Sequence, residues 1–294
     1  MINLISNDTC WVLFLSTSLD MPEDRHIHDI SHGVHCLEQA GISPNNIQIY
    51  IDGIDRRYIH QKASISTKIQ YKIEKSDELF KNLQTNTYKN IVLFVTGHGG
   101  AEGLDSLTPI SPNLLIQSIK GAPNFEIGII YLGQCYAGIF NYTNVSQKTP
   151  KKDIVVVGAT NLHSSLSLDT NEKIGTIPHN WTANIFLLYT FKWFLKPVDV
   201  DGDGVPTIMD SYKYAGTKTN IQNQSTKANN FINLINAYNE IAALQDAQRK
   251  DPNNLNLRLD IDAKLNKYQS NLNNHFIHQE SWILNAIPAQ QITI

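Results

Sequence analysis

The chain has 294 residues, 41% hydrophobic and 17% charged, which permits a large buried core and excludes wholesale disorder. Its formal net charge of -3 provides no basic field for a phosphate backbone, so we expect no nucleic-acid partner. Neither a signal peptide nor a membrane span is visible, because the longest apolar run near the start covers only 11–15. Three cysteines without paired or metal-ligand spacing fit a reducing compartment, so we expect a cytoplasmic protein with no membrane association.

Five short runs rich in aliphatic and β-branched residues predict buried strands at 11–15, 47–51, 91–95, 127–132 and 154–157. Polar, helix-like stretches separate these runs, which is typical of a mostly parallel sheet covered on both faces. Apolar residues at helical spacing predict helices over 24–41, 113–120 and 180–196. The predicted fold class is therefore α/β, a three-layer α/β/α sandwich.

The C-terminal part of the chain has a different pattern. Apolar residues from Ala228 to Lys250 recur with a period of 3.6, and the polar stretch 251–254 then interrupts them. In the next segment the apolar residues first alternate with a period of two and then recur at helical spacing. Its first residues could therefore form either a strand or a helix. We predict a helical hairpin over 228–274, with 276–287 as a candidate returning edge strand. The predicted division is a core at 1–215 and a helical extension at 216–294.

Chemically reactive residues follow two successive predicted strands. His98 stands in the stretch Thr96 to Gly100, and Cys135 stands between Gly133 and Gly138. Because loops at the carboxyl ends of parallel strands converge, both side chains are expected to face one cleft. There Cys135 would attack a carbonyl as a thiolate and His98 would shuttle the proton.

The glycines beside His98 suit the same chemistry. Gly99 lets the backbone approach a bound carbonyl, so that its N–H and the N–H of Cys135 can stabilise an oxyanion. Each motif alone has an ordinary explanation, a loop histidine or a buried small cysteine. Their joint placement favours a catalytic dyad, whereas Cys10 and Cys36 lie in strand and helix patterns and are assigned to packing.

Together, 96–100 and 134–138 resemble the histidine and cysteine motifs of the caspase-like cysteine peptidases, and within them of legumain-type asparaginyl endopeptidases and the catalytic subunit of GPI transamidase. The resemblance spans about residues 10 to 215. It implies a caspase-like fold and cleavage of protein substrates through an acyl-thioester. It also implies a specificity pocket that prefers Asn or Asp, formed by Arg25, Gln134, Ser164 and Ser165.

The chain departs from the family pattern at two positions near the nucleophile. Tyr136 stands where legumains carry an acidic residue, and Gln134 directly precedes Cys135, whereas caspases place their pocket glutamine one position earlier. The preference at the cleavage position therefore stays open. For Arg25, a solvated charge in the first turn of a helix is the alternative interpretation.

The stretch from 199 to 210 has the spacing of an EF-hand-type calcium loop. Oxygen ligands stand at positions 1, 3 and 5, glycine at position 6, a backbone carbonyl at 7 and a carboxylate at 12. Pro206 and an aspartate in place of the usual final glutamate should weaken binding, and an acidic turn without metal is the alternative. A short helix over 209–214 is expected to follow. The predicted ligands of a structural Ca²⁺ ion are Asp199, Asp201, Asp203, Val205 and Asp210.

These features favour a calcium-linked cysteine endopeptidase that acts on protein or peptide substrates. A transamidase or ligase, in which an amine replaces water, would use the same dyad, and the sequence does not separate the two. The second alternative is a non-catalytic, calcium-responsive module that binds a partner through the predicted hairpin. The presence of both His98 and Cys135 argues against that alternative.

Overall fold

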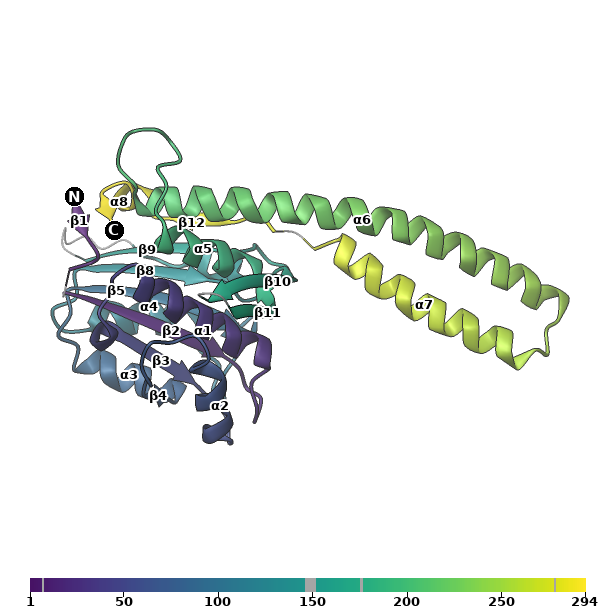
Figure 1. The fold of residues 1–294 in the computed structure, drawn as a ribbon, viewed down its shortest axis with the longest axis horizontal. Helices are drawn as coiled ribbons and strands as arrows, with labels where there is room; N and C mark the ends of the chain where they lie inside the picture. Colours follow the sequence, from purple (N-terminus) through teal and green to yellow (C-terminus); the bar gives the residue numbers. More distant parts are fainter. Residues whose placement is uncertain (7, 146–151, 175–176, 278) are drawn as a thin grey trace. The chain divides into compact units, whose positions relative to one another are not determined.

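The computed structural model describes residues 1–6, 8–145, 152–174, 177–277 and 279–294 (Figure 1). They form two units, one of Met1–Thr219 with Gln279–Ile294 and one of Asn220–His278. The first boundary lies close to the predicted one at 215. The prediction groups the C-terminal segment with the helical extension, but this segment belongs to the first unit, and the strand Trp282–Leu284 at the sheet edge agrees with the candidate returning strand over 276–287.

The first unit contains a seven-stranded sheet in the order β12-β9-β8-β5-β2-β3-β4. Neighbouring strands are parallel except for β12, which pairs antiparallel with β9 at one edge. The predicted mostly parallel sheet is therefore confirmed, and the five predicted runs all lie in it. The strands are β2 (Thr9–Ser16), β3 (Ile47–Ile51), β4 (Ile73–Glu74), β5 (Asn90–Gly97), β8 (Ile127–Leu132), β9 (Asp153–Gly158) and β12 (Trp282–Leu284).

Helices cover both faces of this sheet, which confirms the three-layer class (Figure 1). Alternate residues of β2 point to opposite sides, so Trp11 packs in one apolar cluster with α1 and α5, while Val12 packs in the other with α3 and α4. A further helix, α2, follows β3. The helices are α1 (Asp24–Gln39), α2 (Arg56–Ala63), α3 (Ser76–Gln84), α4 (Pro112–Gly121) and α5 (Ile185–Leu195), with 3-10 turns at Pro44–Asn46 and Ala137–Tyr142.

The predicted helix over 180–196 is wrong in its first turn. A hairpin of β10 (Ser167–Ile174) and β11 (Ile177–Asn184) precedes α5, which begins only at Ile185. The Asn184 side chain caps α5 by accepting from the Leu187 N–H at 3.0 Å. Trp181 gave the misleading periodicity, because it is buried from a strand, where its indole N–H donates to Asp29 at 2.9 Å.

Beyond the calcium-type loop, the predicted helices at 209–214 and 228–250 are one continuous helix, α6 (Ile208–Lys250). No proline interrupts this stretch, so nothing in it forces the helix to stop. In the second unit α6 is followed by α7 (Leu255–His275), and Lys264 of α7 forms an ion pair with Glu240 of α6. The short elements are β1 (Ile2–Asn3), β6 (Gly99–Gly100), β7 (Gly103–Leu104), α8 (Ala286–Ala289) and β13 (Ile292–Thr293).

Among the described residues, none of the helices combines the length and apolar character that crossing a membrane requires.

Candidate active site

His98 and Cys135 lie just past the carboxyl ends of two adjacent strands. β5 ends at Gly97 and β8 ends at Leu132, and the two strands pair in parallel up to Val95 and Leu132. The loops that follow therefore leave the sheet at the same edge, as the sequence predicts. A hollow of about 270 Å³ lies beside the first loop and is lined by His98, Gly99, Gly100, Ala101, Glu102, Gly103, Leu104, Asp105 and Pro109.

The backbone of the His98 loop is fixed to the end of β2. The His98 N–H donates to the Ser16 carbonyl at 2.7 Å, and the Ser16 hydroxyl donates to the carbonyl of Asp105 at 2.8 Å. Gly97 has a φ of +100°, and a Cβ there would collide with the Ser16 carbonyl oxygen. This turn therefore requires glycine, and the turn fixes the position of the His98 backbone.

The His98 loop and the Cys135 loop touch at Gly99. A Cβ on Gly99 would collide with the Gln134 side chain and would lie 2.6 Å from the Cys135 carbonyl oxygen. The imidazole and the thiol are therefore carried on loops in van der Waals contact. Their side chains do not hydrogen-bond to each other among the described residues, a common state for catalytic pairs in the absence of substrate.

Cys135 is the cysteine whose surroundings suit reaction. It is partly exposed, and its Sγ lies 3.4 Å from the Ser165 N–H and 3.9 Å from the Ser165 hydroxyl. Tyr136 takes a left-handed conformation at φ 56°, and its N–H donates to the His163 carbonyl at 2.8 Å. The Cys135 N–H has no acceptor among the described residues, so it is available to an incoming oxygen.

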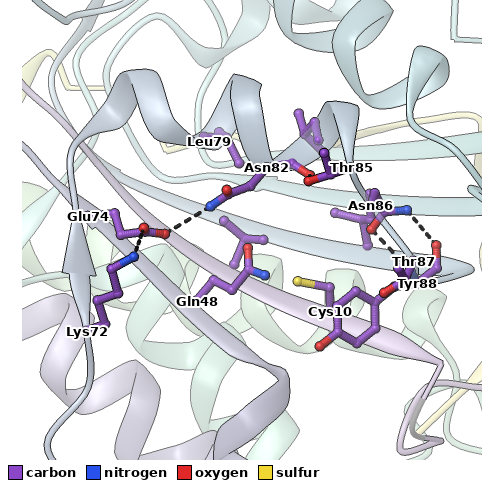
Figure 2. Close-up of a pocket in the computed structure, with 13 residues that line it drawn as sticks. Cys10, Gln48, Lys72, Glu74, Leu79, Asn82, Thr85, Asn86, Thr87 and Tyr88 are labelled. Carbon is purple, nitrogen blue, oxygen red and sulfur yellow. Dashed lines mark hydrogen bonds and ion pairs between the residues drawn. The ribbon is translucent and has the colours of Figure 1, made fainter.

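The other two cysteines are not suited to reaction. Burial raises the pKa of the Cys10 thiol, and likewise that of Cys36, to about 12. Cys10 lines a hollow of about 320 Å³ together with polar side chains such as Gln48 and Asn82 (Figure 2). That hollow lies at the amino ends of β2, β3 and β5, the opposite end of the sheet from His98, so it does not belong to the candidate site.

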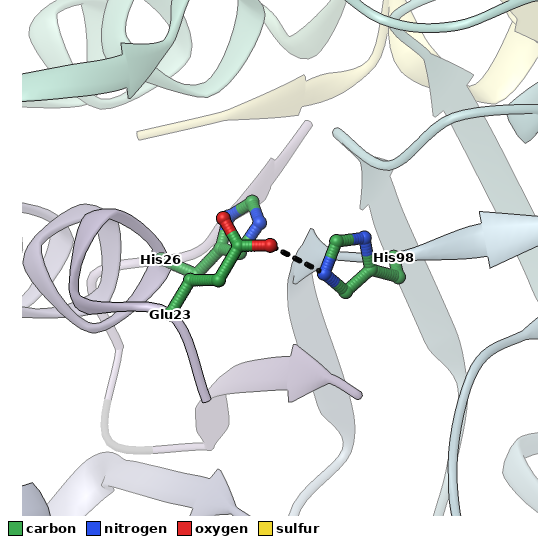
Figure 3. Close-up of side chains that lie close together, drawn as sticks. All are labelled: Glu23, His26 and His98. Atoms are coloured by element: carbon green, nitrogen blue, oxygen red, sulfur yellow. Dashed lines mark ion pairs between the residues drawn. The ribbon is translucent and has the colours of Figure 1, made fainter. Parts of the chain in front are cut away.

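Glu23 is a site residue that the sequence reasoning missed. Its Oε1 lies 3.0 Å from His98 Nε2 (Figure 3). Its other carboxylate oxygen accepts from Arg25. The hydrogen bond from Arg25 lowers the pKa of the Glu23 carboxyl, and the positive charges of Arg25, His26 and His98 act in the same direction. An ionised Glu23 can therefore orient the imidazole. Glu23 stands two residues before Arg25, which is expected in the specificity pocket, but nothing in the local sequence marks Glu23 as the partner of His98.

The residues expected in the specificity pocket are only partly brought together. Arg25 Nη1 lies 3.3 Å from the Ser167 hydroxyl, two residues beyond Ser165, which contacts Cys135. Gln134 is 1% exposed, so its side chain is buried within the loop that carries the nucleophile, and its Oε1 has no hydrogen-bond partner in the described part of the chain. Ser164 is exposed and makes no described contact with these groups.

Gln279 supports the segment next to the nucleophile and was also missed by the sequence reasoning. Its Oε1 accepts from the Leu166 N–H at 2.6 Å, and the residue is 1% exposed. The nearby Trp282, in β12, packs against Gly158 and donates its indole N–H to the Thr160 carbonyl at 2.9 Å. The returning C-terminal segment thus holds the chain that carries Ser165.

The calcium-type loop gathers three of its predicted ligands. One carboxylate oxygen from each of Asp199, Asp201 and Asp203 lies within 4.8 Å of the others. Lys213 makes an ion pair with Asp201 at 2.6 Å and partly neutralises the cluster. Val205 donates its N–H to Asp203 at 2.9 Å.

Asp210, the predicted final ligand, has a different role. It is fully buried, and one of its oxygens accepts from the N–H groups of Val200 and Asp201. Its other oxygen accepts from the N–H and the hydroxyl of Thr207, each at 2.9 Å. Four donors thus occupy this carboxylate, so Asp210 closes the loop onto the start of α6 and is not part of the three-aspartate cluster.

No protein-family model matches the chain, and no curated protein matches it. Among solved structures, that of drICE, a caspase, is similar to this chain at 9% sequence identity. The match covers 73% of this chain and 83% of the drICE chain, with a TM-score of 0.35. A likeness at this level carries no assignment of activity, and the narrower resemblance to legumains and the transamidase stays a sequence interpretation.

Proposed function

We propose that the chain is a cysteine endopeptidase that uses Cys135 as nucleophile and His98 as acid and base. The observation that carries the proposal is the contact at Gly99 between the two loops that carry a partly exposed thiol and a histidine at the ends of adjacent strands. The Glu23 carboxylate also lies within hydrogen-bonding distance of the His98 imidazole. These are the parts of a thiol hydrolase, a nucleophile, a base and a group that orients the base.

The proposed reaction begins when His98 accepts the proton of the Cys135 thiol. The thiolate sulfur then attacks the peptide carbonyl carbon, and the carbonyl π electrons move onto oxygen, where the N–H of Cys135 and the backbone beside His98 stabilise the charge. The C–N bond breaks as His98 gives its proton to the leaving amine. Water, deprotonated by His98, then cleaves the thioester, and Glu23 stabilises the imidazolium in both steps.

A thiol-reactive peptide probe tests the proposal directly. We expect stoichiometric labelling of the full chain at Cys135 and loss of the label in Cys135→Ala. Cys36→Ser is the matched control and should label like the wild type, because Cys36 is buried. Equal labelling of wild type and Cys135→Ala would instead favour a module that does not use this thiol.

We further propose that Arg25 lines the pocket for the side chain at the cleavage position and selects Asn or Asp. Its bond to Ser167 places the guanidinium next to the segment that contacts Cys135. A hydrogen bond to a charged group contributes about 1.5–3 kcal/mol, so Arg25→Ala should reduce the preference for Asn or Asp about tenfold or more in kcat/KM. Profiling a peptide library with wild type, Arg25→Ala and the surface control Arg57→Ala measures this. A wild type that prefers Lys or Arg would contradict the assignment.

For the loop at 199–210 we propose weak, structural calcium binding through Asp199, Asp201 and Asp203, whose clustered carboxylates repel one another without a cation. At a hundredfold excess over Kd a ligand of the folded state adds about 2.7 kcal/mol. For a unit of this size we expect calcium to raise the Tm by roughly 5–10 °C over the value in chelator.

Two variants separate the loop's roles in the same thermal unfolding experiment. Asp203→Ala should no longer show the rise in Tm on addition of calcium, and its Tm in chelator should stay close to that of the wild type. Asp210→Ala should lower the Tm in both conditions, because it leaves four donors of the loop unpaired. A wild-type Tm that is the same in calcium and in chelator would show that the loop is an acidic turn without metal.

A further inference from the structure

Three side chains with metal-binding atoms converge beside the candidate dyad. Glu23, His26 and His98 each offer one ligand atom, and these atoms lie within 4.8 Å of one another (Figure 3). The two imidazole rings stand nearly perpendicular, with centroids 5.2 Å apart. Two imidazoles that bind one tetrahedral zinc ion at about 2.0–2.1 Å place their ring centres about 5 Å apart, so the spacing suits a shared metal.

His26 has a free nitrogen lone pair in a buried position. Its side chain is 4% exposed, and its Nε2 has no hydrogen-bond partner among the residues that the structure describes. Its Nδ1 lies 3.2 Å from the Thr96 hydroxyl oxygen, and that hydroxyl donates its proton to Asp29 at 2.7 Å. The Thr96 oxygen must therefore accept from Nδ1–H, which leaves the lone pair on Nε2. A hydrogen-bonded N–H on the far side of the ring is the usual support of a metal-binding histidine.

Glu23 supplies the carboxylate of the set. Arg25 holds one of its oxygens, while Oε1 faces His98 Nε2 at 3.0 Å. The side chains of Glu23 and His98 are 40% and 33% exposed, so water can reach the fourth position of a metal bound here. Two histidines, one glutamate and a water are an established ligand set for zinc.

We propose that Glu23, His26 and His98 bind one Zn²⁺ ion, and that this metal switches off the thiol chemistry proposed above. Zinc on His98 Nε2 displaces the proton that this nitrogen shares with Glu23. The remaining ring proton is then fixed on Nδ1, so the imidazole can no longer accept a proton from Cys135. The effect on activity rests on the proposed peptidase function, whereas the binding of the metal does not.

Calorimetric titration of the metal-free full chain with Zn²⁺ tests the binding, with hydrolysis followed in parallel. We expect one zinc per chain and inhibition that a chelator reverses. His26→Phe keeps the ring and removes its nitrogens, and it should weaken zinc binding at least about tenfold. His28→Phe is the matched control. The ring centroids of His28 and His179 lie 5.0 Å apart, a similar spacing, but neither histidine belongs to a three-ligand group among the described residues.

Thr96→Val is a second test that keeps the shape of a buried residue and removes the hydroxyl that supports His26 and donates to Asp29. It should weaken zinc binding about tenfold, with the fold checked by circular dichroism. Cys135→Ser should bind zinc like the wild type, and the Co²⁺ form should show ligand-field absorption without a thiolate charge-transfer band. Loss of zinc binding in Cys135→Ser or His28→Phe, or unchanged binding in both His26→Phe and Thr96→Val, would overturn the inference.

Zinc binding is measured by the same titration on Cys135→Ser, which lacks the nucleophile. That result stands even if the wild-type chain hydrolyses no peptide. An active peptidase that zinc neither binds nor inhibits would overturn the zinc site alone and leave the proposed function in place.

Discussion

Cys135→Ala is expected to lower kcat/KM for peptide hydrolysis by at least about a thousandfold, and His98→Ala by a similar factor. The two groups act as one unit, because a thiol without its base and a base without its thiol both lack the first step of the reaction. The double variant should therefore be no worse than either single variant. Steady-state kinetics on a fluorogenic peptide would measure all three.

The fold should survive these changes, which separates a chemical loss from a structural one. Cys135 and His98 are partly exposed, so their truncation opens no large cavity in the core. The Tm of both variants should stay close to that of the wild type. Cys10→Ser is the control for a general effect of thiol loss and should keep its activity. Full activity in both Cys135→Ala and His98→Ala would contradict the central proposal.

The sheet could be predicted because its strands are buried on both faces and so appear as continuous apolar runs. β8 and β9 are examples, since their aliphatic and aromatic residues are divided between the two apolar clusters on opposite faces of the sheet. The start of α5 could not be found in this way. Ile185 follows directly on the buried end of β11, so buried residues continue across the boundary and periodicity does not detect it.

The positions of His98 and Cys135 could also be predicted, because a residue just after a strand lies at the edge where loops converge. Glu23 and Gln279 could not, because each acts through a partner that is distant in the chain. Gln279 bonds to Leu166, 113 residues away, and no local pattern marks it. Asp210 fitted a ligand spacing, but the spacing does not reveal that four nearby donors already occupy its carboxylate.

Gly99→Ala is expected to lower kcat/KM about a hundredfold, the largest effect we expect from a residue without a reactive side chain. The added Cβ would lie 2.6 Å from the Cys135 carbonyl oxygen and would also collide with Cγ of the buried Gln134 side chain, close to its backbone. Relief requires the two loops to separate by several tenths of an ångström to about 1 Å. A misplacement of that size in a catalytic constellation costs about 10²-fold.

Gly100→Ala provides the matched control, because a Cβ on that glycine meets nothing within 4 Å. The two variants add the same methyl group at neighbouring positions of one strand, so they share any general cost of replacing glycine in this loop. We expect Gly100→Ala to keep its activity within a few-fold of the wild type. Gly99→Ala should hydrolyse peptide more slowly and should also be labelled more slowly at Cys135. Equal activity of the two variants would mean that the loops separate without harm, and the contact at Gly99 would then not be what holds the thiol and the imidazole together.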